Sequence, residues 1–435
     1  MPSQPHASVV PPVPPPSGCP AHAVPLMGPR FHTDLEAVYR DMRHDHGPVV
    51  PVTLPGEVPA WLVIGYREMY QVTSDPALFP RDKRIWNQWE RLPRDWPLRP
   101  MFGEEQPSIY STVGEEHRRH RALVQNALER VSQLELRRHT EELSDRLVDG
   151  FCGHGTAELI SAYAKPLPML VLARLIGFPD SDGPELLTVL AAIADSGPDA
   201  IAAQRRVLEM VAGVFAAKRE RPGADLASYM LAYQGDFTDD ELVVDLQTVN
   251  AAGYLTTADW IGNTVRLMLT DDRFAAALAG GRNSVPDAMN EVLWEDTPTQ
   301  ILAGRWAARD TRLGGQHVGA GDLLLLGLAG ANADPAAHVT PFAGDGRTAG
   351  ADGLRNNNFA HFSFSHGEFA CPFAAQEIAE TVARTGVEVL LDRLPDIELS
   401  VSPATLARRP SPFLRGMTGL PTHFTPTPAH VRTLR

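Results

Sequence analysis

The sequence has few cysteines, no long hydrophobic run and a deficit of positive charge, and each shortage argues against a class of function. Cys19, Cys152 and Cys371 are the only cysteines in 435 residues, and no two of them are close in sequence. This spacing disfavours a disulfide framework, a zinc knuckle or an iron–sulfur cluster. No apolar stretch reaches the roughly 20 residues that span a bilayer, and no signal-peptide pattern is present. We therefore expect a reduced, cytoplasmic protein without membrane attachment.

The net charge and hydrophobic content indicate a large folded body. A formal charge of −14 argues against nucleic acid as a partner. Hydrophobic residues make up 43% of the chain, enough for a large core, and nothing marks a linker between domains. Residues 1–29 are proline-rich and are expected to form a disordered arm. Residues 30–435 are predicted to form one domain.

Helical patterns dominate this domain. Apolar residues recur at helical spacing in segments 34–42, 114–128, 163–175, 185–221 and 238–269. Two strands are predicted at 49–54 and 60–64 around a Pro55-Gly56 turn, and further strands around the glycine-rich turns that follow residue 301. The predicted fold class is mainly α with a small β region.

Cys371 lies where an irregular segment gives way to a helix. Residues 364–367 have no regular period, whereas apolar residues recur at helical spacing after Pro372. A helix N-terminus favours a thiolate, and proline suits the first helical position. The turn alone fits a buried free cysteine or a Cys-Pro regulatory haem site, although Cys19-Pro20 shows that this dipeptide also occurs in plain proline-rich sequence.

His117 and Arg121 lie four residues apart on one face of the helix predicted at 114–128. Both can donate hydrogen bonds to a carboxylate, although a basic helix face is often only solvated. Arg118, Arg119 and His120 extend this positive patch within an acidic protein. Such a patch would suit the docking of an acidic redox partner.

The middle of the helix predicted at 238–269 contains Ala252, Gly253 and Thr256. Thr238 and Glu241 form a capping box at its start. Glycine in a helix interior costs about 1 kcal/mol relative to alanine, so another requirement could explain it. Gly253 permits close approach of a flat ligand, and the Thr256 hydroxyl can bond to the preceding turn or to a ligand. The other interpretation is an accidental weak spot.

The cysteine segment resembles the haem-ligand loop of the cytochrome P450 family, Phe-x-x-Gly-x-His-x-Cys-x-Gly. Phe369 replaces the histidine that usually binds a haem propionate, and Phe373 replaces the second glycine. The resemblance implies the cytochrome P450 fold and haem b, with Cys371 as the iron ligand. It assigns four residues of this loop to cofactor binding: Phe364, His366, Gly367 and Cys371.

The resemblance continues over nearly the whole chain after the arm. It implies that His117, Arg121 and Arg305 hold the haem propionates. It also implies that residues 252–257 form a groove over the iron, with Ala252, Gly253 and Thr256 in catalytic positions. The segment 408–424 resembles the C-terminal hairpin of the family, whose tip often lines the substrate pocket.

Two positions depart from the family pattern. Leu255 replaces the acid of an acid-alcohol pair that delivers protons, while Asp259 either lies near the same face or is exposed. Trp294 replaces the arginine of a buried Glu-x-x-Arg pair. We expect its indole N–H to satisfy Glu291 in part, unless Glu291 is simply exposed on an amphipathic helix.

The resemblance implies a monooxygenase that inserts one oxygen atom of O2 into a small apolar substrate. Electrons would come from NAD(P)H through ferredoxin reductase and ferredoxin. A thiolate ligand on haem iron favours cleavage of the O–O bond. Two alternatives remain: a haem-thiolate protein that binds a ligand or partner with little turnover, and a peroxide-driven oxidase. No pattern in the sequence indicates the substrate.

Overall fold

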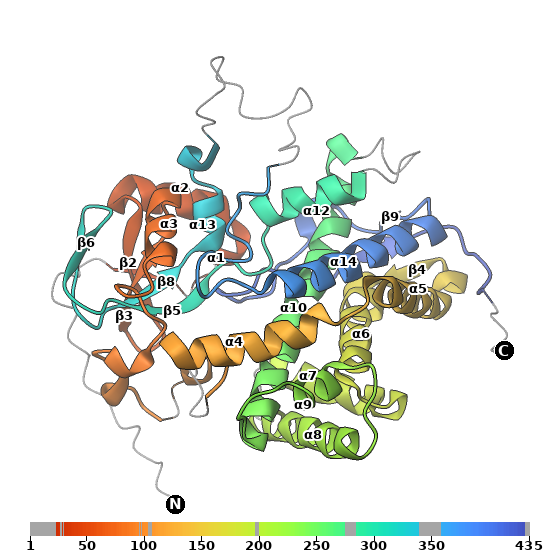
Figure 1. The fold of residues 1–435 in the computed structure, drawn as a ribbon. Coiled ribbons are helices and arrows are strands. Elements are labelled where there is room, and N and C mark those ends of the chain that lie inside the picture. The colour runs from red at the N-terminus through yellow and green to blue at the C-terminus, as the bar shows by residue number, and fades with distance from the viewer. Residues whose placement is uncertain are drawn as a thin grey trace, which may run out of the picture.

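The computed structural model describes residues 23–430, apart from residues 27, 29, 95, 97, 103–106, 196–199, 275–283 and 339–357. Helices form most of the molecule, and one sheet lies at its side together with α2, α3 and α13 (Figure 1). The predicted fold class, mainly α with a small β region, is confirmed. Cys19 and most of the proline-rich arm lie outside the described residues. The arm's last part contains strand β1, which pairs with β2, so ordered chain begins before residue 30.

Helices α2, α4, α6, α7, α8 and α10 correspond to predicted segments, whereas α3, α5 and α9 were not predicted. The predicted break near Gly197-Pro198 falls outside the described residues. Gly177 ends α6 in a left-handed conformation (φ 106°), as its position in the sequence predicts. The described helices are α1 (Arg30–Thr33), α2 (Leu35–His46), α3 (Tyr66–Ser74), α4 (Gly114–Glu129), α5 (Gln133–Asp149), α6 (Pro166–Ile176), α7 (Gly183–Asp195), α8 (Ala200–Glu220), α9 (Leu226–Leu231), α10 (Asp239–Thr270), α12 (Ser284–Glu295), α13 (Leu328–Asn332) and α14 (Phe373–Arg393).

The largest sheet has the strand order β1-β2-β3-β8-β5. The predicted hairpin is confirmed: β2 and β3 are antiparallel, with Val49 opposite Val63. Strand β3 also pairs with β8 in parallel, and the indole N–H of Trp61 donates to Asp322 Oδ2, 261 residues later, at 3.0 Å. The strands of this sheet are β1 (Val24–Pro25), β2 (Val49–Leu54), β3 (Val58–Val63), β5 (Leu302–Trp306) and β8 (Leu323–Leu326).

Two smaller sheets complete the β region. Strand β10 joins β4 and β9, so the C-terminal segment is attached to residues after α5. The predicted C-terminal hairpin is present, with Arg408 opposite Met417. The strands are β4 (Thr156–Glu158), β9 (Glu398–Leu399) and β10 (Pro421–His423) in one sheet, and β6 (Thr311–Leu313) and β7 (Gln316–Val318) in the other.

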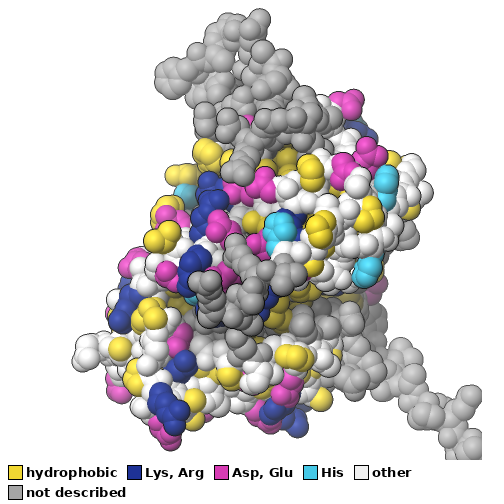
Figure 2. Space-filling view, turned by 90° about the vertical axis from the view of Figure 1, so that its right-hand side faces the viewer, with side chains coloured by type: hydrophobic (Ala, Val, Ile, Leu, Met, Phe, Trp, Pro, Cys, Tyr) yellow, Lys and Arg dark blue, Asp and Glu magenta, His cyan; other side chains and the backbone are white. Residues whose placement is uncertain are grey.

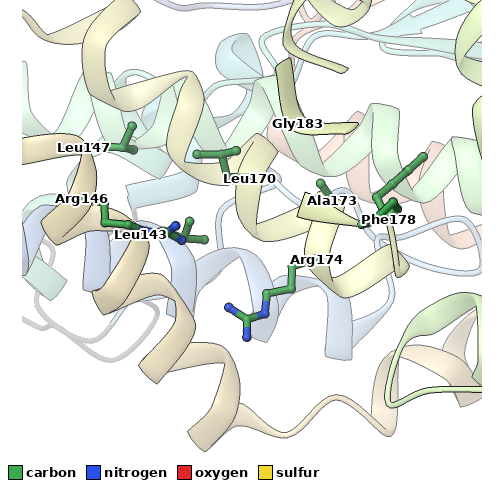
Figure 3. A pocket seen from close by; sticks show the side chains of 9 residues that line it. Leu143, Arg146, Leu147, Leu170, Ala173, Arg174, Phe178 and Gly183 are labelled. Carbon is green, nitrogen blue, oxygen red and sulfur yellow. The ribbon is translucent and has the colours of Figure 1, made fainter. Parts of the chain in front are cut away.

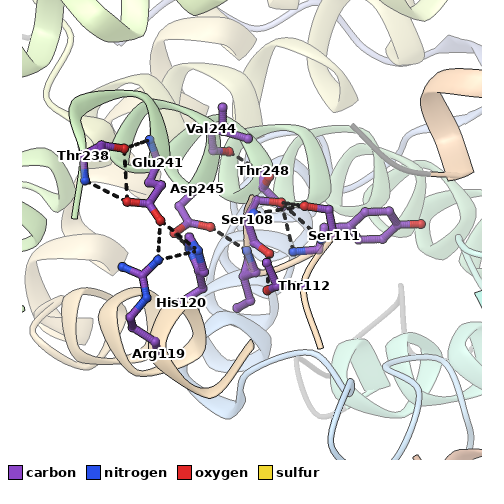
Figure 4. Close-up of polar contacts among 12 residues, drawn as sticks. Ser108, Ser111, Thr112, Arg119, His120, Thr238, Glu241, Val244, Asp245 and Thr248 are labelled. Carbon is purple, nitrogen blue, oxygen red and sulfur yellow. Dashed lines mark hydrogen bonds and ion pairs between the residues drawn. The ribbon is translucent and has the colours of Figure 1, made fainter. Parts of the chain in front are cut away.

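Helix α10 passes through the middle of the helical body (Figure 1) and packs against α6, α8, α12 and α14. Its 32 residues correspond to about 48 Å. The predicted capping box is confirmed, because the backbone N–H of Glu241 donates to Thr238 Oγ1 at 3.2 Å and that of Thr238 donates to Glu241 Oε2 at 2.7 Å (Figure 4). These bonds satisfy backbone donors of the first turn that the helix itself leaves unpaired.

A buried polar contact fixes α4 against α10. His120 Nδ1 lies 2.6 Å from Asp245 Oδ2, and both side chains are fully buried (Figure 4). Asp245 Oδ1 accepts the backbone N–H of Ile109 at 2.6 Å. Burial raises the pKa of the Asp245 carboxyl, and hydrogen bonding to His120 opposes this effect. Asp245 therefore fixes both α4 and the segment before it onto the central helix.

The surface carries charges of both signs. On the face drawn in Figure 2, Asp and Glu side chains lie among Lys and Arg side chains. Exposed ion pairs such as Arg138–Glu135, at 2.7 Å, are of the kind that stabilises a fold by less than about 1 kcal/mol. Within the described part of the chain, no helix combines the length and the apolar character needed to cross a bilayer.

Candidate functional site

The cysteine loop is a tight turn held by backbone contacts. The N–H of Cys371 donates to Phe364 O at 3.0 Å, and the N–H of Ala370 donates to Gly367 O at 3.1 Å. Gly367 has φ of +76°, and a Cβ at this position would lie 2.1 Å from Thr73 O. Only glycine allows both this backbone conformation and this close approach to α3.

The start of α14 differs in two respects from the prediction. Pro372 is the N-cap rather than the first helical residue, because its ψ of 138° is extended. Cys371 therefore precedes the helix by two positions. Burial raises the pKa of the Cys371 thiol to about 11, while the nearby positive charge of Arg121 acts in the opposite direction. Burial therefore favours the neutral thiol, whereas a helix N-terminus was expected to favour the thiolate.

A cluster of basic side chains surrounds the ring of Phe369. The guanidinium carbons of Arg81 and Arg305 lie 4.8 and 4.7 Å from the ring centroid, and the His117 ring lies 4.8 Å from it. Arg121 Nη1 donates to Ala370 O in the same loop at 2.8 Å. Three residues predicted from the sequence, His117, Arg121 and Arg305, are therefore brought together beside the cysteine loop.

This basic cluster is buried and its donors are incompletely used. Arg305 and His117 are each 1% exposed and Arg81 is 9% exposed. Arg305 Nε and Nη2, Arg81 Nε and His117 Nδ1 have no hydrogen-bond partner. Burial, and secondarily the charge of Arg81, lower the pKa of Arg305. Burial also lowers the pKa of His117 to about 4, which keeps its ring neutral at pH 7.

The cluster has the properties of an anion site. Among the described residues, no carboxylate forms an ion pair with Arg81, Arg121 or Arg305. An unpaired buried charge costs several kcal/mol, so the buried guanidinium groups of Arg81 and Arg305 require an anionic partner. A cofactor that carries two carboxylates and also takes a thiolate ligand fits this set of groups beside Cys371.

Arg81 is the member of this cluster that no sequence pattern singled out. It lies in the stretch 81–110, where tryptophan, proline and arginine occur without a period. The structure folds this stretch as irregular chain with short 3-10 turns. The only local feature of Arg81 is that it follows the buried Phe79 by two residues. This arrangement is too common to indicate a site.

His366 and Phe364 take different positions in the loop. His366 Nδ1 lies 3.3 Å from Thr73 Oγ1, and its ring packs on Tyr70 with centroids 4.8 Å apart. His366 therefore faces α3 rather than the basic cluster. The ring of Phe364 makes an edge contact with Trp260 at 5.9 Å. This contact joins the cysteine loop to α10.

Gly253 of α10 was expected to leave room for a flat ligand, but the structure places a neighbouring helix there. A Cβ on Gly253 would lie 3.3 Å from Leu172 Cδ1, so the side without a side chain packs against α6 rather than opening a groove. Thr256 Oγ1 donates to Ala252 O at 2.5 Å. Ala252 is exposed although most of α10 beyond Thr256 is buried. The face that carries Ala252 and Thr256 is therefore the accessible one.

The expectation that Asp259 is exposed is wrong, because Asp259 is buried and paired. Its carboxylate is 5% exposed, and both oxygens accept hydrogen bonds from Arg409 Nη2. Burial raises the pKa of Asp259 to about 6, and the charge of Arg409 opposes this shift. Asp259 thus binds the C-terminal hairpin to α10.

The predicted contact between Trp294 and Glu291 is wrong. Trp294 is 1% exposed and its indole N–H donates to Asn358 O at 2.8 Å. Glu291 is also buried, at 1% exposure, and Arg273 Nη1 lies 4.0 Å from its Oε2. The alternative of an exposed Glu291 is therefore wrong as well. Trp294 reaches a segment 64 residues away, which local spacing cannot reveal.

Asp296, which follows α12, is the centre of a buried ion-pair network. Its carboxylate contacts Arg266 of α10 at 3.2 Å, and Arg408 and Arg415 of the C-terminal hairpin at 2.5 Å each. Asn263 also binds Arg408, at 2.8 Å. These three arginines hold the pKa of Asp296 far below its usual value despite its burial. The network fixes the hairpin against α10 and α12.

The positive patch predicted around Arg118 is largely neutralised. Arg118 pairs with Glu115 at 2.6 Å, and Arg119 pairs with Glu241. His120 is fully buried against Asp245. These residues therefore do not form the open basic surface that was expected for docking an acidic partner.

A separate hollow of about 210 Å³ lies between α5 and α6 (Figure 3). Its lining is mainly apolar and includes Leu143 from α5, Leu170 from α6, and Phe178. Arg174 at its edge lies 3.9 Å from Glu142. None of the residues that line this hollow is a predicted site residue, and one of its two basic residues, Arg174, has an acidic neighbour.

Comparisons with known proteins agree with this geometry, although no family model matches the chain. Cytochrome P450 107B1 of Saccharopolyspora erythraea is 29% identical over 397 residues, which cover 90% of this chain and 95% of that protein. Vitamin D(3) 25-hydroxylase of Pseudonocardia autotrophica is 27% identical over 412 residues, covering 93% and 97%. Among solved structures, a ligand-bound CYP154C4 from Streptomyces sp. ATCC 11861 has a TM-score of 0.81 and 27% identity, covering 93% of this chain and 98% of that one.

Proposed function

The chain belongs to the cytochrome P450 family of haem monooxygenases, in its actinobacterial-type branch, and from this premise we propose its reaction. It inserts one oxygen atom of O2 into a small apolar organic substrate. Electrons come from NAD(P)H through a ferredoxin reductase and a ferredoxin, in the cytoplasm. The vitamin D(3) 25-hydroxylase matches this chain over nearly its whole length. Its name supports an apolar substrate.

The buried basic cluster is the observation that carries this proposal. In this proposal His117, Arg121 and Arg305 hold the two propionates of haem b, and Cys371 supplies the thiolate. The unpartnered buried nitrogens of His117 and Arg305 beside the cysteine loop support it. When bound, a haem with a thiolate ligand supplies the chemistry of O–O cleavage and oxygen insertion. Without an anionic ligand, the buried guanidinium groups would lack a counter-charge among the described residues.

The accessible face of α10 supports binding of the substrate next to the haem. Ala252 and Thr256 lie on this face and Leu255 is half-buried beside it, so its surface is mainly apolar. Thr256 is the one residue of these three with a side-chain hydroxyl. Because Thr256 uses its hydroxyl proton to bond Ala252 O, its hydroxyl oxygen can still accept a hydrogen bond from a proton donor. Water must reach this hydroxyl directly, because Leu255 can neither bind nor pass a proton.

The reaction is tested with purified holoprotein, surrogate ferredoxin and its reductase. The reduced carbon monoxide complex should show thiolate-type absorption, and apolar compounds should shift the ferric spectrum. Product formed per NADPH consumed then measures turnover. A thiolate spectrum with ligand-induced shifts but no product in any combination of partners would contradict a monooxygenase. That result would favour the haem-thiolate ligand-binding protein, which the absent acid at Leu255 also favours.

We expect Leu255→Asp to raise the product formed per NADPH severalfold. A positioned proton donor typically contributes about 10²-fold or more to a rate, and Leu255 offers none. The matched control is Leu255→Asn, which has nearly the same shape as aspartate but no ionisable group. An equal gain in both variants would show that the change in polarity, rather than proton transfer, is responsible. Activities are compared per thiolate-ligated haem.

Asp259→Asn is expected to lower stability rather than turnover. Arg409 holds both carboxylate oxygens, so Asp259 is not free to carry protons toward Thr256. Loss of this charge-assisted contact should lower the free energy of unfolding by about 1.5–3 kcal/mol. Urea unfolding and NADPH coupling are measured on the same preparation. Lost coupling with unchanged stability would make Asp259 a proton relay instead.

A further inference from the structure

Phe369 stands at the loop position where the family motif has a histidine, and the guanidinium groups of Arg81 and Arg305 both lie over its ring. Phenylalanine cannot donate a hydrogen bond to a propionate. The loop therefore lacks one donor of the usual set. The face of an aromatic ring does attract a guanidinium group, and stacking leaves the edge N–H groups of the guanidinium free for other partners.

Arg81 is fixed in this arrangement by contacts on several sides. Its Nη2 donates to Phe369 O at 3.0 Å, and its Nη1 lies 3.3 Å from Tyr110 O. Its guanidinium carbon lies 4.8 Å from the Tyr110 ring centroid as well. After these contacts Arg81 Nε is still buried without a partner. A long side chain held this firmly has already lost most of its conformational freedom, so binding an anion orders it little further.

Burial of a second arginine next to Arg305 needs an explanation. The two guanidinium groups lie 4.8 and 4.7 Å from the centroid of one ring, and each carries a positive charge that the other disfavours. No described carboxylate pairs with either one. Structural roles alone could be served by a neutral residue, which would avoid this repulsion.

We propose that Arg81 is a propionate ligand of the haem and that Phe369 positions it, so that the two residues together replace the missing histidine. The proposal rests on the proposed function, because it requires haem in this site. It adds a cofactor-binding residue from the segment before α4, a segment that otherwise contributes no predicted ligand.

The test compares Arg81→Gln with the parent holoprotein in the rate of haem transfer to excess apomyoglobin. We expect transfer to be about tenfold faster or more, since one charged hydrogen bond is lost. The reduction potential of the haem should also shift to a more negative value, because a positive charge next to the propionates is removed. Arg84→Gln is the matched control, since Arg84 is exposed and pairs with Asp82. It should leave both quantities unchanged.

Haem dimethyl ester, whose propionates are blocked, separates ligation from packing. With this cofactor the parent and Arg81→Gln should lose haem at the same rate. A difference that persists with the ester would show that Arg81 only supports the loop, and would overturn the proposal. Equal rates with natural haem would also overturn it. Arg81→Lys keeps the charge, so its rate of haem loss should lie between the rates of the parent and of Arg81→Gln. If Arg81→Lys lost haem as fast as Arg81→Gln, the effect would come from lost packing instead.

Restoring the motif histidine gives an independent check. The double variant Arg81→Gln with Phe369→His should regain part of the haem retention that Arg81→Gln loses, because a ring N–H returns to the loop. No recovery would count against a shared role for the two positions. A parent protein without a thiolate-type spectrum would overturn the proposed function itself. A parent with that spectrum, and with haem loss unaffected by Arg81→Gln, would overturn only the role of Arg81.

Discussion

Cys371→Ala is expected to abolish the thiolate-type absorption of the reduced carbon monoxide complex. Cys371 is the cysteine in the loop beside the basic cluster, and its N–H is held by Phe364 O at 3.0 Å. Alanine offers no ligand for iron, so the thiolate signature cannot form. Some haem should remain, because the basic cluster proposed to bind its propionates is unchanged. Absorption spectra and haem content of the purified variant measure both effects.

Cys152→Ala is the matched control for this experiment. Cys152 is 1% exposed, and its sulfur lies 3.9 Å from Arg393 Nη2 of α14 and 4.0 Å from the backbone oxygen of Asp149 in α5. The control should keep the full thiolate spectrum. If the thiolate spectrum were lost in Cys152→Ala and kept in Cys371→Ala, the assignment of the iron ligand would be wrong.

Asp296→Asn should produce a loss of stability of about 3–5 kcal/mol, the range for breaking a buried ion pair. Asp296 is 4% exposed and is the shared partner of Arg266, Arg408 and Arg415. Without its charge, three partly buried guanidinium groups face one another. Urea unfolding of the holoprotein measures the effect. Asp287, exposed in the first turn of the preceding helix, is the control; Asp287→Asn should cost less than about 1 kcal/mol.

The pH dependence of stability gives a second measurement of the same network. Because the pKa of Asp296 is lower in the folded protein than in the unfolded chain, its contribution is fully present above about pH 4. The contribution is lost as pH falls toward the folded-state pKa. The stability difference between the parent and Asp296→Asn should therefore be constant from pH 5 to 8 and shrink in acid. A difference that grew on acidification would contradict this role.

The features predicted correctly from the sequence depend on neighbours in the chain. The capping box of Thr238 and Glu241 satisfies its bonds within three residues, so its pattern is visible locally. The hairpin of β2 and β3 is similarly marked by its Pro55-Gly56 turn. His117 and Arg121 share a face because a helix repeats every 3.6 residues. Local signals were sufficient in these three cases.

The features that were missed or wrong depend on distant partners. Asp259 is buried because Arg409 arrives 150 residues later, and the indole of Trp294 turns to Asn358 rather than Glu291. Arg81 joins the basic cluster only because the cysteine loop, 288 residues on, places Phe369 next to it. Where a side chain has several possible partners, tertiary packing determines which one it contacts. No local pattern in a single sequence reveals that packing.

The parallel pairing of β3 with β8 has a consequence for how the protein is made. Trp61 and Asp322 are bonded but lie 261 residues apart in the chain. At a synthesis rate of 5–20 residues per second, the β2–β3 hairpin leaves the ribosome about 13–50 s before β8 exists. During this interval the hairpin has one uncovered edge, which can pair with a strand of another nascent chain. Slower translation of the intervening helices should therefore lower the yield of folded protein more than slower translation after residue 326.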